Sequence, residues 1–507
     1  MLPVQEPTRS YWIEGAASPL RDCRTTGHLP KETDVVIIGS GYSGATIAYW
    51  LQKYTQNHDE QPRMVLLEAR DLCGAATGRN GGHLRPHAYS RYLPWKERFG
   101  AKGALELIEH EVAHLDAFKS LASDEGSEFT EEVCLKFGET FDAAMTDEAW
   151  TRLKNNYEAM KEDHGEDNDI VKTIRVISDS HEAEAFSQMK GAQAAIVHPA
   201  GQIWPYKFVH AILRILLKTG KLNVQAHTPA TSVSERDSDG WIIVTTDRGE
   251  IRARAVAHAT NRWASHLLPE FRKLIHGDRG TLAAVKAPEG FLKHTGAQHW
   301  DAIVNNYHLQ LPSPSNAIIL GGARQFLVHR PEACFPNDEE DKQIEGIEEF
   351  FQSWPASDVA GWVGTGPAEL ARDIDDGGVW TGIEASSIDS FPFVGPVPDL
   401  SMLHAPTRPR EGHFIAAGFA GHGMPRILGS TAHLAPYILK SLNLRHSTPP
   451  AAALFPSLPK PFRATPARLE RLLNTANVAA KVEAYQVACE ESARKPFCSD
   501  ERCRGKL

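Results

Sequence analysis

One short stretch near the N-terminus constrains the fold of this chain more than any other feature. Residues 34–38 form a nearly continuous apolar run rich in β-branched side chains, which is typical of a strand buried on both faces of a parallel sheet. The sequence Gly39-Ser40-Gly41-Tyr42-Ser43-Gly44 follows at once, and then come a helix-forming stretch, a second apolar run over 64–67 and Glu68. This order predicts a β-α-β unit whose glycine loop and helix N-terminus hold the pyrophosphate of a dinucleotide.

Each glycine of this G-x-G-x-x-G pattern has its own physical role. Gly39 makes the tight turn, Gly41 lets the backbone approach the phosphates, and Gly44 lets the helix lie close to the strand. Glu68 stands at the end of the second strand, where a carboxylate accepts hydrogen bonds from ribose hydroxyls and disfavours a 2′-phosphate. We therefore expect a dinucleotide other than NADP, although the loop alone does not distinguish FAD from NAD.

Motifs spread along the rest of the chain narrow the cofactor to FAD. They are Gly74-Ala75-Ala76-Thr77-Gly78-Arg79-Asn80-Gly81-Gly82-His83, then residues 256–263, residues 389–396, and Gly418-Phe419-Ala420-Gly421-His422-Gly423-Met424. In this order, over about residues 34–434, the motifs resemble the D-amino-acid oxidase-like family of flavoproteins. The likeness is closest to the γ-glutamylputrescine oxidase and glycine–sarcosine oxidase type.

The resemblance implies an α/β fold, in which a Rossmann-type FAD-binding domain carries an inserted mixed α+β substrate domain. We expect a lead-in over 1–32, a discontinuous FAD-binding domain from 33–100, 194–265 and 376–445, a substrate domain from 101–193 and 266–375, and a C-terminal linker and helix over 446–507. Strand patterns recur around 194–197, 241–246 and 252–259, whereas the stretch from 101 to 190 is helix-prone and short of strand signals. Thr465-Pro466 is typical of an N-cap followed by the first residue of a terminal helix.

The resemblance also assigns residues to the cofactor. The residues expected to contact FAD are Gly39, Gly41, Tyr42, Ser43, Gly44, Glu68, Ala69, Arg70, Arg79, Asn80, Gly81, Gly82, His83, Gly418, Gly421, Gly423 and Met424. His83 has two interpretations, because a histidine near this position is covalently linked to the flavin in some relatives and makes only polar or packing contacts in others. A linkage through cysteine is excluded between Trp380 and Asp389, where no cysteine occurs.

Family members oxidise a C–N bond by passing a hydride equivalent to flavin N5, and the resemblance makes O₂ the expected electron acceptor. His422, Arg324 and Tyr307 are the candidates on the substrate side. His422 either contacts the flavin or holds the glycine loop, and Arg324 either binds a substrate carboxylate or is an ordinary solvated or core-edge side chain. Tyr307 is a candidate aromatic wall above the flavin, though it could equally be a core residue. Arg426 places a charge directly after the second glycine cluster, which an unusual substrate or a salt bridge would explain.

Two other functions keep the same fold, namely an FAD-dependent dehydrogenase of an alcohol or hydroxy acid and an inactive flavin-binding protein. Oxygen consumption with release of hydrogen peroxide separates an oxidase from a dehydrogenase. An inactive protein would bind FAD that no amine, amino acid or hydroxy acid bleaches.

Composition excludes several other classes of function. A formal net charge of −10 without a basic stripe argues against a nucleic-acid partner. No apolar run approaches the ~18 residues of a membrane span, and no CxxC pair indicates a metal site.

The seven scattered cysteines fit a reducing compartment, so we expect a cytoplasmic protein. The C-terminal Gly505-Lys506-Leu507 differs from the peroxisomal Ser-Lys-Leu signal by its glycine, which leaves import into peroxisomes open. The sequence leaves the oligomeric state open.

Overall fold

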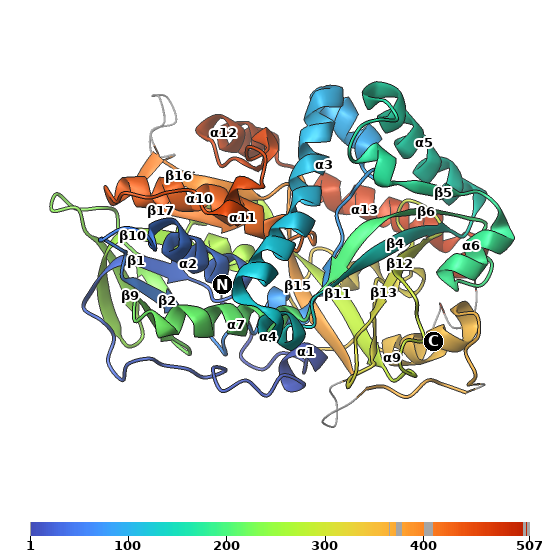
Figure 1. Cartoon of the computed structure of the whole chain (residues 1–507), viewed down its shortest axis with the longest axis horizontal. Coiled ribbons are helices and arrows are strands. Elements are labelled where there is room, and N and C mark those ends of the chain that lie inside the picture. Colours follow the sequence, from blue (N-terminus) through green and yellow to red (C-terminus); the bar gives the residue numbers. More distant parts are fainter. Residues whose placement is uncertain (1, 365, 372–377, 400–408, 500–502, 504–507) are drawn as a thin grey trace.

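Two β-sheets lie side by side in the chain, each with its own helices (Figure 1). We describe a computed structural model that covers residues 2–364, 366–371, 378–399, 409–499 and 503. A long helix, α3 (Tyr92–Glu125), runs between the two sheets and is interrupted at Gly100.

The first sheet is the expected Rossmann-type sheet. Its main path is β16 (Phe393–Pro398), β17 (Pro409–Ala417), β10 (Gly249–His258), β1 (Glu32–Ile38), β2 (Met64–Leu67) and β7 (Leu222–Gln225). The strands from β17 to β7 are parallel, and β16 joins the edge in antiparallel orientation. A hairpin of β8 (Ala230–Val233) and β9 (Ile242–Thr246) extends from β10. Strand β1 is central because its side chains from Val35 to Ile38 are buried on both faces, as the apolar run predicts.

Three helices cover this sheet next to β1. They are α2 (Tyr42–Thr55), α7 (Pro205–Lys218) and α10 (Ile427–Ser441). Helix α2 lies between the other two and contacts both, so nearly all its side chains are buried. Helices α2 and α10 each begin directly after a glycine cluster, which brings the two clusters to the same region of the sheet.

The second sheet is mixed and mostly antiparallel. Its order is β15 (Val379–Ser387), β11 (Ile275–Val285), β14 (Ile318–Gly321), β13 (Asn305–Gln310), β12 (Thr295–His299), β4 (Lys136–Ala144), β6 (Ala194–Gln202) and β3 (His83–Leu84), and β5 (Arg175–Ile177) pairs with β6. Its accompanying helices are α5 (Asp147–His164), α6 (Ser180–Ser187), α8 (Arg324–Leu327) and α9 (Ile347–Asp358), whereas α4 (Ser127–Glu132) contacts α3 and α7.

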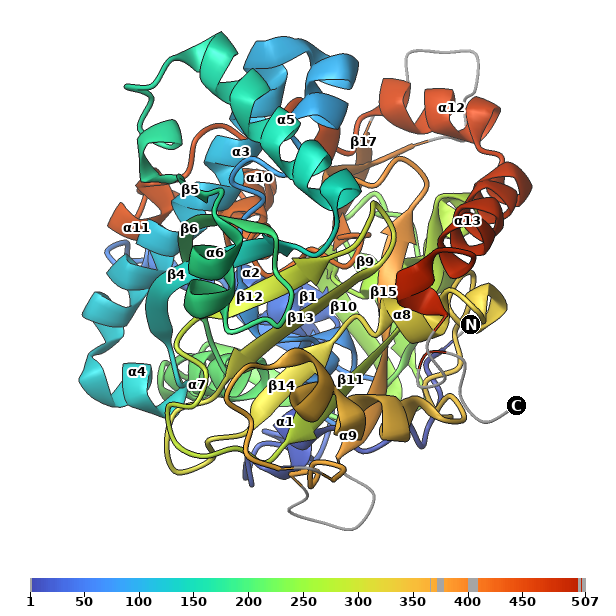
Figure 2. The same cartoon turned by 90° about the vertical axis from the view of Figure 1, so that its right-hand side faces the viewer.

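Both ends of the chain contact these sheets. Near the N-terminus, α1 (Tyr11–Glu14) is mostly buried. After α10 the chain forms α11 (Pro450–Ala453), α12 (Pro466–Thr475) and α13 (Val478–Ala493), and α13 lies along the outer side of the second sheet near α8 (Figure 2). The hydroxyl of Thr465 accepts a hydrogen bond from the backbone N–H of Arg468, which confirms the predicted N-cap of α12.

The strands differ from the sequence-based expectations in two respects. Residues 194–202 and 379–387 form β6 and β15 of the second sheet, although the expected division places both stretches in the FAD-binding segments. Strands β4 and β5 lie in the stretch that lacks strand signals, because their pairing with β6 and β12 decides their conformation. The other domain boundaries stay predictions. Across the described ranges, no helix combines the length and apolar character that crossing a bilayer requires.

Candidate functional site

The first glycine loop has a backbone that larger residues could not adopt. Gly39 has a φ of +104°, and a Cβ there would lie 2.6 Å from the carbonyl oxygen of Ala259. A Cβ on Gly44 would lie 1.8 Å from the carbonyl oxygen of Gly39. Helix α2 therefore begins close against the end of β1, and Gly41 is its N-cap. The free N–H groups of this helix N-terminus are available to an anion such as a pyrophosphate.

Four hydrogen bonds hold the carboxylate of Glu68 at the end of β2. Its Oε2 accepts from the backbone N–H and the hydroxyl of Ser40, at 3.0 and 2.7 Å. Its Oε1 accepts from the backbone N–H groups of Ala69 and Arg70, at 2.8 and 3.2 Å. The carboxylate is thus oriented before any ligand arrives, as the ribose-binding role requires.

One cavity is lined both by this loop and by the second glycine cluster. Its wall also includes Glu68, Trp263 and Glu384. The predicted cofactor residues that line it are Gly39, Gly41, Tyr42, Ser43, Glu68, Ala69, Arg79, Asn80, Gly421, Gly423 and Met424. The remaining predicted cofactor residues, Gly44, Arg70, Gly81, Gly82, His83 and Gly418, lie behind or beside its wall.

The Gly74–His83 stretch is held by buried polar contacts. The Arg79 guanidinium lies 3.4 Å from Glu340 and donates to the carbonyl oxygens of Gly74 and Thr381. Burial lowers the pKa of Arg79 to about 10, against the opposing charge of Glu340. The indole N–H of Trp380 donates to the carbonyl oxygen of Arg79 at 3.0 Å, so Trp380 supports this stretch from the core. Arg70 shares the Glu340 carboxylate at 2.9 Å.

Gly81 and Tyr307 meet beside the cavity. A Cβ on Gly81 would lie 2.6 Å from Cε2 of Tyr307, and one on Gly321 would lie 2.2 Å from its Cζ. The two glycines therefore make room for the phenol ring. Burial and the nearby charge of Glu384 raise the pKa of Tyr307 above its ordinary value, so the hydroxyl is protonated and can donate a hydrogen bond.

Two carboxylates and one guanidinium lie next to this ring. Asp278 on β11 stands directly opposite Glu384 on β15 in the strand register. Burial, followed by the charge of Asp278, raises the pKa of Glu384 to about 7 against the opposing charge of Arg324. Arg324 donates from Nη1 to the hydroxyl of Tyr485 on α13 at 3.0 Å. Arg324 and Tyr307 therefore lie near each other, but neither belongs to the wall of the cavity.

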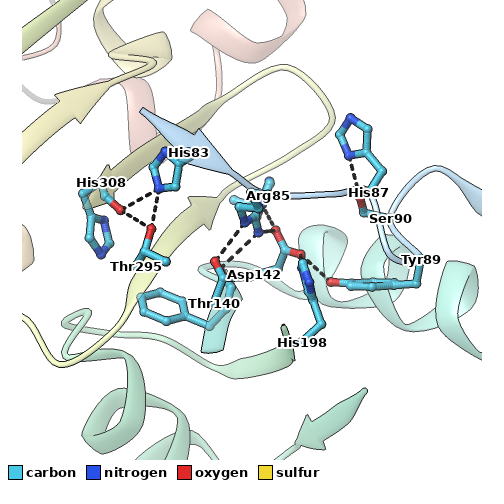
Figure 3. Close-up of polar contacts among 12 residues, drawn as sticks. His83, Arg85, His87, Tyr89, Ser90, Thr140, Asp142, His198, Thr295 and His308 are labelled. Carbon is cyan, nitrogen blue, oxygen red and sulfur yellow. Dashed lines mark hydrogen bonds and ion pairs between the residues drawn. The ribbon is translucent and has the colours of Figure 1, made fainter. Parts of the chain in front are cut away.

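His83 is not part of the wall of that cavity, and its ring contacts Thr295 and His308 of the second sheet (Figure 3). Its Nε2 contacts the hydroxyl of Thr295 and lies 3.0 Å from the carbonyl oxygen of His308. Burial, followed by the charge of Arg85, lowers its pKa to about 3, so the ring is neutral. In the same view the carboxylate of Asp142 receives hydrogen bonds from Arg85 and Tyr89, which fix the segment after His83 to the sheet. Whether His83 contacts the flavin stays a prediction.

His422 lies in a buried charge network at the second glycine cluster. Its Nε2 is 3.0 Å from Oε2 of Glu111, and Arg426 donates from Nε to Oε1 of Glu111 at 2.8 Å. Burial alone would raise the pKa of Glu111, but His422 and Arg426 hold it well below its ordinary value. The carboxylate is therefore ionised and accepts from His422, and this salt bridge explains the charge of Arg426 after the glycines. A flavin contact of His422 stays a prediction.

The sequence analysis did not identify Glu384 and Asp278 as site residues, and it did not place either end of the chain at the site. Glu384 is a lone acid in the apolar stretch Val379–Ala385, and that position was a usable signal. Asp278 and Tyr485 carry no local signal of this kind. Leu2 and Pro3 line the cavity, and Arg70 donates to the carbonyl oxygen of Val4, so the N-terminal lead-in forms part of the wall.

The residues present fit FAD. The glycine loop, the oriented carboxylate of Glu68 and the two helix N-termini supply sites for a pyrophosphate, a ribose and a ring system along one cavity. When bound, FAD supplies the acceptor for a hydride equivalent.

Known structures with the same fold include an L-amino acid deaminase from Proteus vulgaris, lacking its specific insertion sequence. It has a TM-score of 0.60 at 16% identity, over 89% of this chain and 99% of that chain. Glycine oxidase from Geobacillus kaustophilus has a TM-score of 0.55 at 19% identity, over 85% and 100%. L-α-Glycerophosphate oxidase from Mycoplasma pneumoniae, solved with FAD bound, has a TM-score of 0.57 at 14% identity, over 85% and 100%.

A search of curated proteins by sequence finds no match. The profile of the DAO family, described as FAD dependent oxidoreductase, matches residues 34–435, from the first strand to the middle of α10. The sequence motifs, the cavity and this match agree, and the chain belongs to the DAO family of FAD-dependent oxidoreductases.

Proposed function

We propose that the protein is an oxidase that oxidises the C–N bond of an amine or amino acid, by hydride transfer to flavin N5 and with O₂ as the electron acceptor. One observation carries the choice of an amine over a hydroxy acid. Glu384 presents a carboxylate to the cavity beside a second carboxylate, Asp278. An ammonium group is attracted to such a wall, whereas the carboxylate of a hydroxy acid is repelled by it.

The residues of this chain act on the substrate by binding and orienting it. Glu384 faces the cavity, and the apolar side chains of Leu282, Ile383 and Ile427 line it and exclude water, whereas Tyr307 with its protonated hydroxyl lies beside the cavity wall. The similar structures agree with an amine or amino acid as the substrate, since a deaminase and a glycine oxidase are among them. The glycerophosphate oxidase has the same fold, so the fold alone does not choose the substrate.

The test is a series of spectra on FAD-loaded protein without oxygen. We expect amines or amino acids to bleach the flavin band, and admitted air to restore it with release of hydrogen peroxide. Bleaching by alcohols or hydroxy acids alone would refute the amine oxidation. Bleaching by amines that only an artificial electron acceptor reverses would refute O₂ as the acceptor.

The cysteines and the C-terminus bear on the compartment. All seven cysteines are described and none forms a disulfide, which supports a reducing compartment such as the cytoplasm. The Gly505-Lys506-Leu507 sequence lies outside the described residues. Fractionation of cells that express the tagged full-length chain, with the tag at the N-terminus, tests the cytoplasmic assignment.

A further inference from the structure

Glu384 differs from every other charged side chain in the wall of the cavity. Glu68 accepts four hydrogen bonds, and Arg79 pairs with Glu340. Glu384 lines the same cavity, yet within the described ranges it makes no hydrogen bond and no ion pair. Glu384 is half-buried, so its carboxylate is open to a ligand that supplies the missing partner.

Asp278 adds a second carboxylate at the same point. It faces Glu384 across the β11–β15 pair, and burial raises its pKa as well, against the charges of Arg324 and Lys481. The charged or titratable groups near the two acids are Arg324 on α8, Tyr307 on β13, Lys481 and Tyr485 on α13, and Cys334. Two like charges this close favour any ligand that brings a positive charge between or beside them.

The nearby cations are engaged elsewhere. Arg324 donates to the hydroxyl of Tyr485, and Lys481 donates from Nζ to the carbonyl oxygen of Ser387 at 2.9 Å. In the described part of the chain, neither cation comes within ion-pair distance of Asp278 or Glu384. The acidic pair is therefore left for a cation from outside the protein.

We propose that Glu384, supported by Asp278, binds the ammonium group of the substrate and accepts its proton, so that the substrate is an amine without a carboxylate on the reacting carbon. This inference rests on the proposed function and narrows its substrate class. A carboxylate on that carbon would be brought next to two like charges.

The chemical step balances with the oxidant that the proposed function names. The substrate arrives as R–CH₂–NH₃⁺, one N–H bond breaks, and the proton passes to the Glu384 carboxylate. The C–H bond then breaks, both of its electrons leave with the hydride to FAD, and the nitrogen lone pair forms the C=N bond of R–CH=NH₂⁺. Water hydrolyses this iminium ion to an aldehyde and ammonium. O₂ would take the two electrons and the proton of the hydride, together with the proton held by Glu384, to give hydrogen peroxide, and Glu384 would return to its carboxylate form.

The proton transfer is within reach of ordinary pKa shifts. An alkylammonium group resembles that of lysine, with a pKa of about 10 in water. The pKa of Glu384 is about 7. The gap is about three units, and burial lowers the pKa of a cationic amine by up to ~3–5 units, whereas the two carboxylates raise it. The neutral amine is therefore a minor species of the bound substrate, and Glu384 accepts the proton when it forms.

The first test uses two unreactive probes of the same shape. tert-Butylammonium carries no hydrogen on the carbon that bears nitrogen, and pivalate replaces its ammonium by a carboxylate. Each is titrated into the FAD-loaded protein, and the change in the flavin spectrum gives a Kd. We expect tert-butylammonium to bind more tightly than pivalate. The Glu384→Gln variant should raise the Kd of tert-butylammonium by about tenfold or more, as for a lost charged hydrogen bond.

Two further variants accompany this titration. Glu483→Gln removes an exposed carboxylate from α13 and should leave the Kd unchanged. Asp278→Asn should raise the Kd of tert-butylammonium by about threefold or more. This variant replaces Glu384→Gln in the test if Glu384→Gln does not retain FAD. Tighter binding of pivalate, or a Kd in both acid variants within twofold of the parent protein, would overturn the proposal.

The second test compares butylamine with norvaline, which differ by one carboxylate on the reacting carbon. We expect butylamine to bleach the flavin at least about tenfold faster without oxygen, the effect of a like charge costing about 1.4 kcal/mol. Faster bleaching by norvaline would overturn the substrate class. The two proposals can fail separately, because the probes report binding without reaction. If tert-butylammonium binds through Glu384 and no amine is ever oxidised, the proposed function is wrong while the ammonium site stands.

Discussion

The two ends of the cavity are built in different ways. Most of the nucleotide end comes from the stretch 38–80, in which the loop glycines and Glu68 already have their contacts, and residues 2–3, 228–230 and 259–267 complete the wall. The substrate end is assembled from β11, β13, β15, α8 and α13, and leaves Glu384 without a partner. A fixed cofactor is served by a rigid, satisfied site, whereas a site for chemistry keeps a perturbed charge ready for its substrate.

The two ends of the chain contact different ends of the cavity region. The family profile matches residues 34–435, and the segments outside it reach opposite ends of the site. Leu2 and Pro3 line the cavity that Glu68 also lines, while Tyr485 and Lys481 of α13 stand beside Arg324 and Asp278. The segments outside the family profile therefore contribute to both ends of the site.

The largest expected effect is at the nucleotide end. Gly44→Ala places a Cβ 1.8 Å from the carbonyl oxygen of Gly39, so α2 must move away from the end of β1. We expect FAD binding to weaken by at least about 100-fold, since the pyrophosphate loses its helix N-terminus. The flavin content of the purified protein measures this. Gly138→Ala is the matched control, because its Cβ would meet nothing within 4 Å. Full flavin content in Gly44→Ala would show that the loop is not the pyrophosphate site.

The next effect is a pH dependence at the substrate end. Burial raises the pKa of Glu384 to about 7, so the carboxylate that binds an ammonium is present above pH 7 and lost below it. We expect kcat/KM for an amine to rise by about tenfold from pH 6 to pH 8, following the ionised fraction of this acid. The rise should be absent in Glu384→Gln. An unchanged pH profile in that variant would assign the titration to another group.

A smaller effect is expected where the C-terminal helix meets the site. Tyr485→Phe removes the hydroxyl that accepts from Arg324, which would turn the guanidinium towards the acidic pair and compete with the substrate. We expect KM for an amine to rise by about threefold, the size of one hydrogen bond, with little change in kcat or flavin content. Tyr437→Phe, on the exposed side of α10, is the control. A KM unchanged in both variants would remove α13 from the site.

The smallest expected effect is on stability, and it has the opposite sign to the effect on activity. The folded state raises the pKa of Glu384 from 4.5 to about 7, so the folded protein binds a proton more tightly there than the unfolded chain does. Stability from this group is complete below pH 4.5 and is lost as the pH rises to 7. Glu384→Gln should therefore raise Tm at pH 8 by on the order of 1–3 °C, and by less at pH 5. Thermal denaturation of the FAD-free protein measures both, and a lower Tm at pH 8 would show that Glu384 has a stabilising partner.

The sequence by itself determined the nucleotide end. The apolar run, the three glycines and Glu68 lie within one β-α-β unit, and their conformation follows from short-range sterics and hydrogen bonding, so the order of residues was enough. The N-cap at Thr465 was predictable for the same reason. The family motifs further indicated FAD and the two-sheet architecture, which the structure and the family match bear out.

Only the tertiary structure decided the substrate end. Asp278 meets Glu384, Arg324 meets Tyr485, and His422 meets Glu111, in each case across more than 100 residues of sequence. The register of β11 with β15 and the docking of α13 set these pairs, and both depend on packing between distant segments. No local pattern encodes such a register, because it is fixed by the fit of whole surfaces during folding.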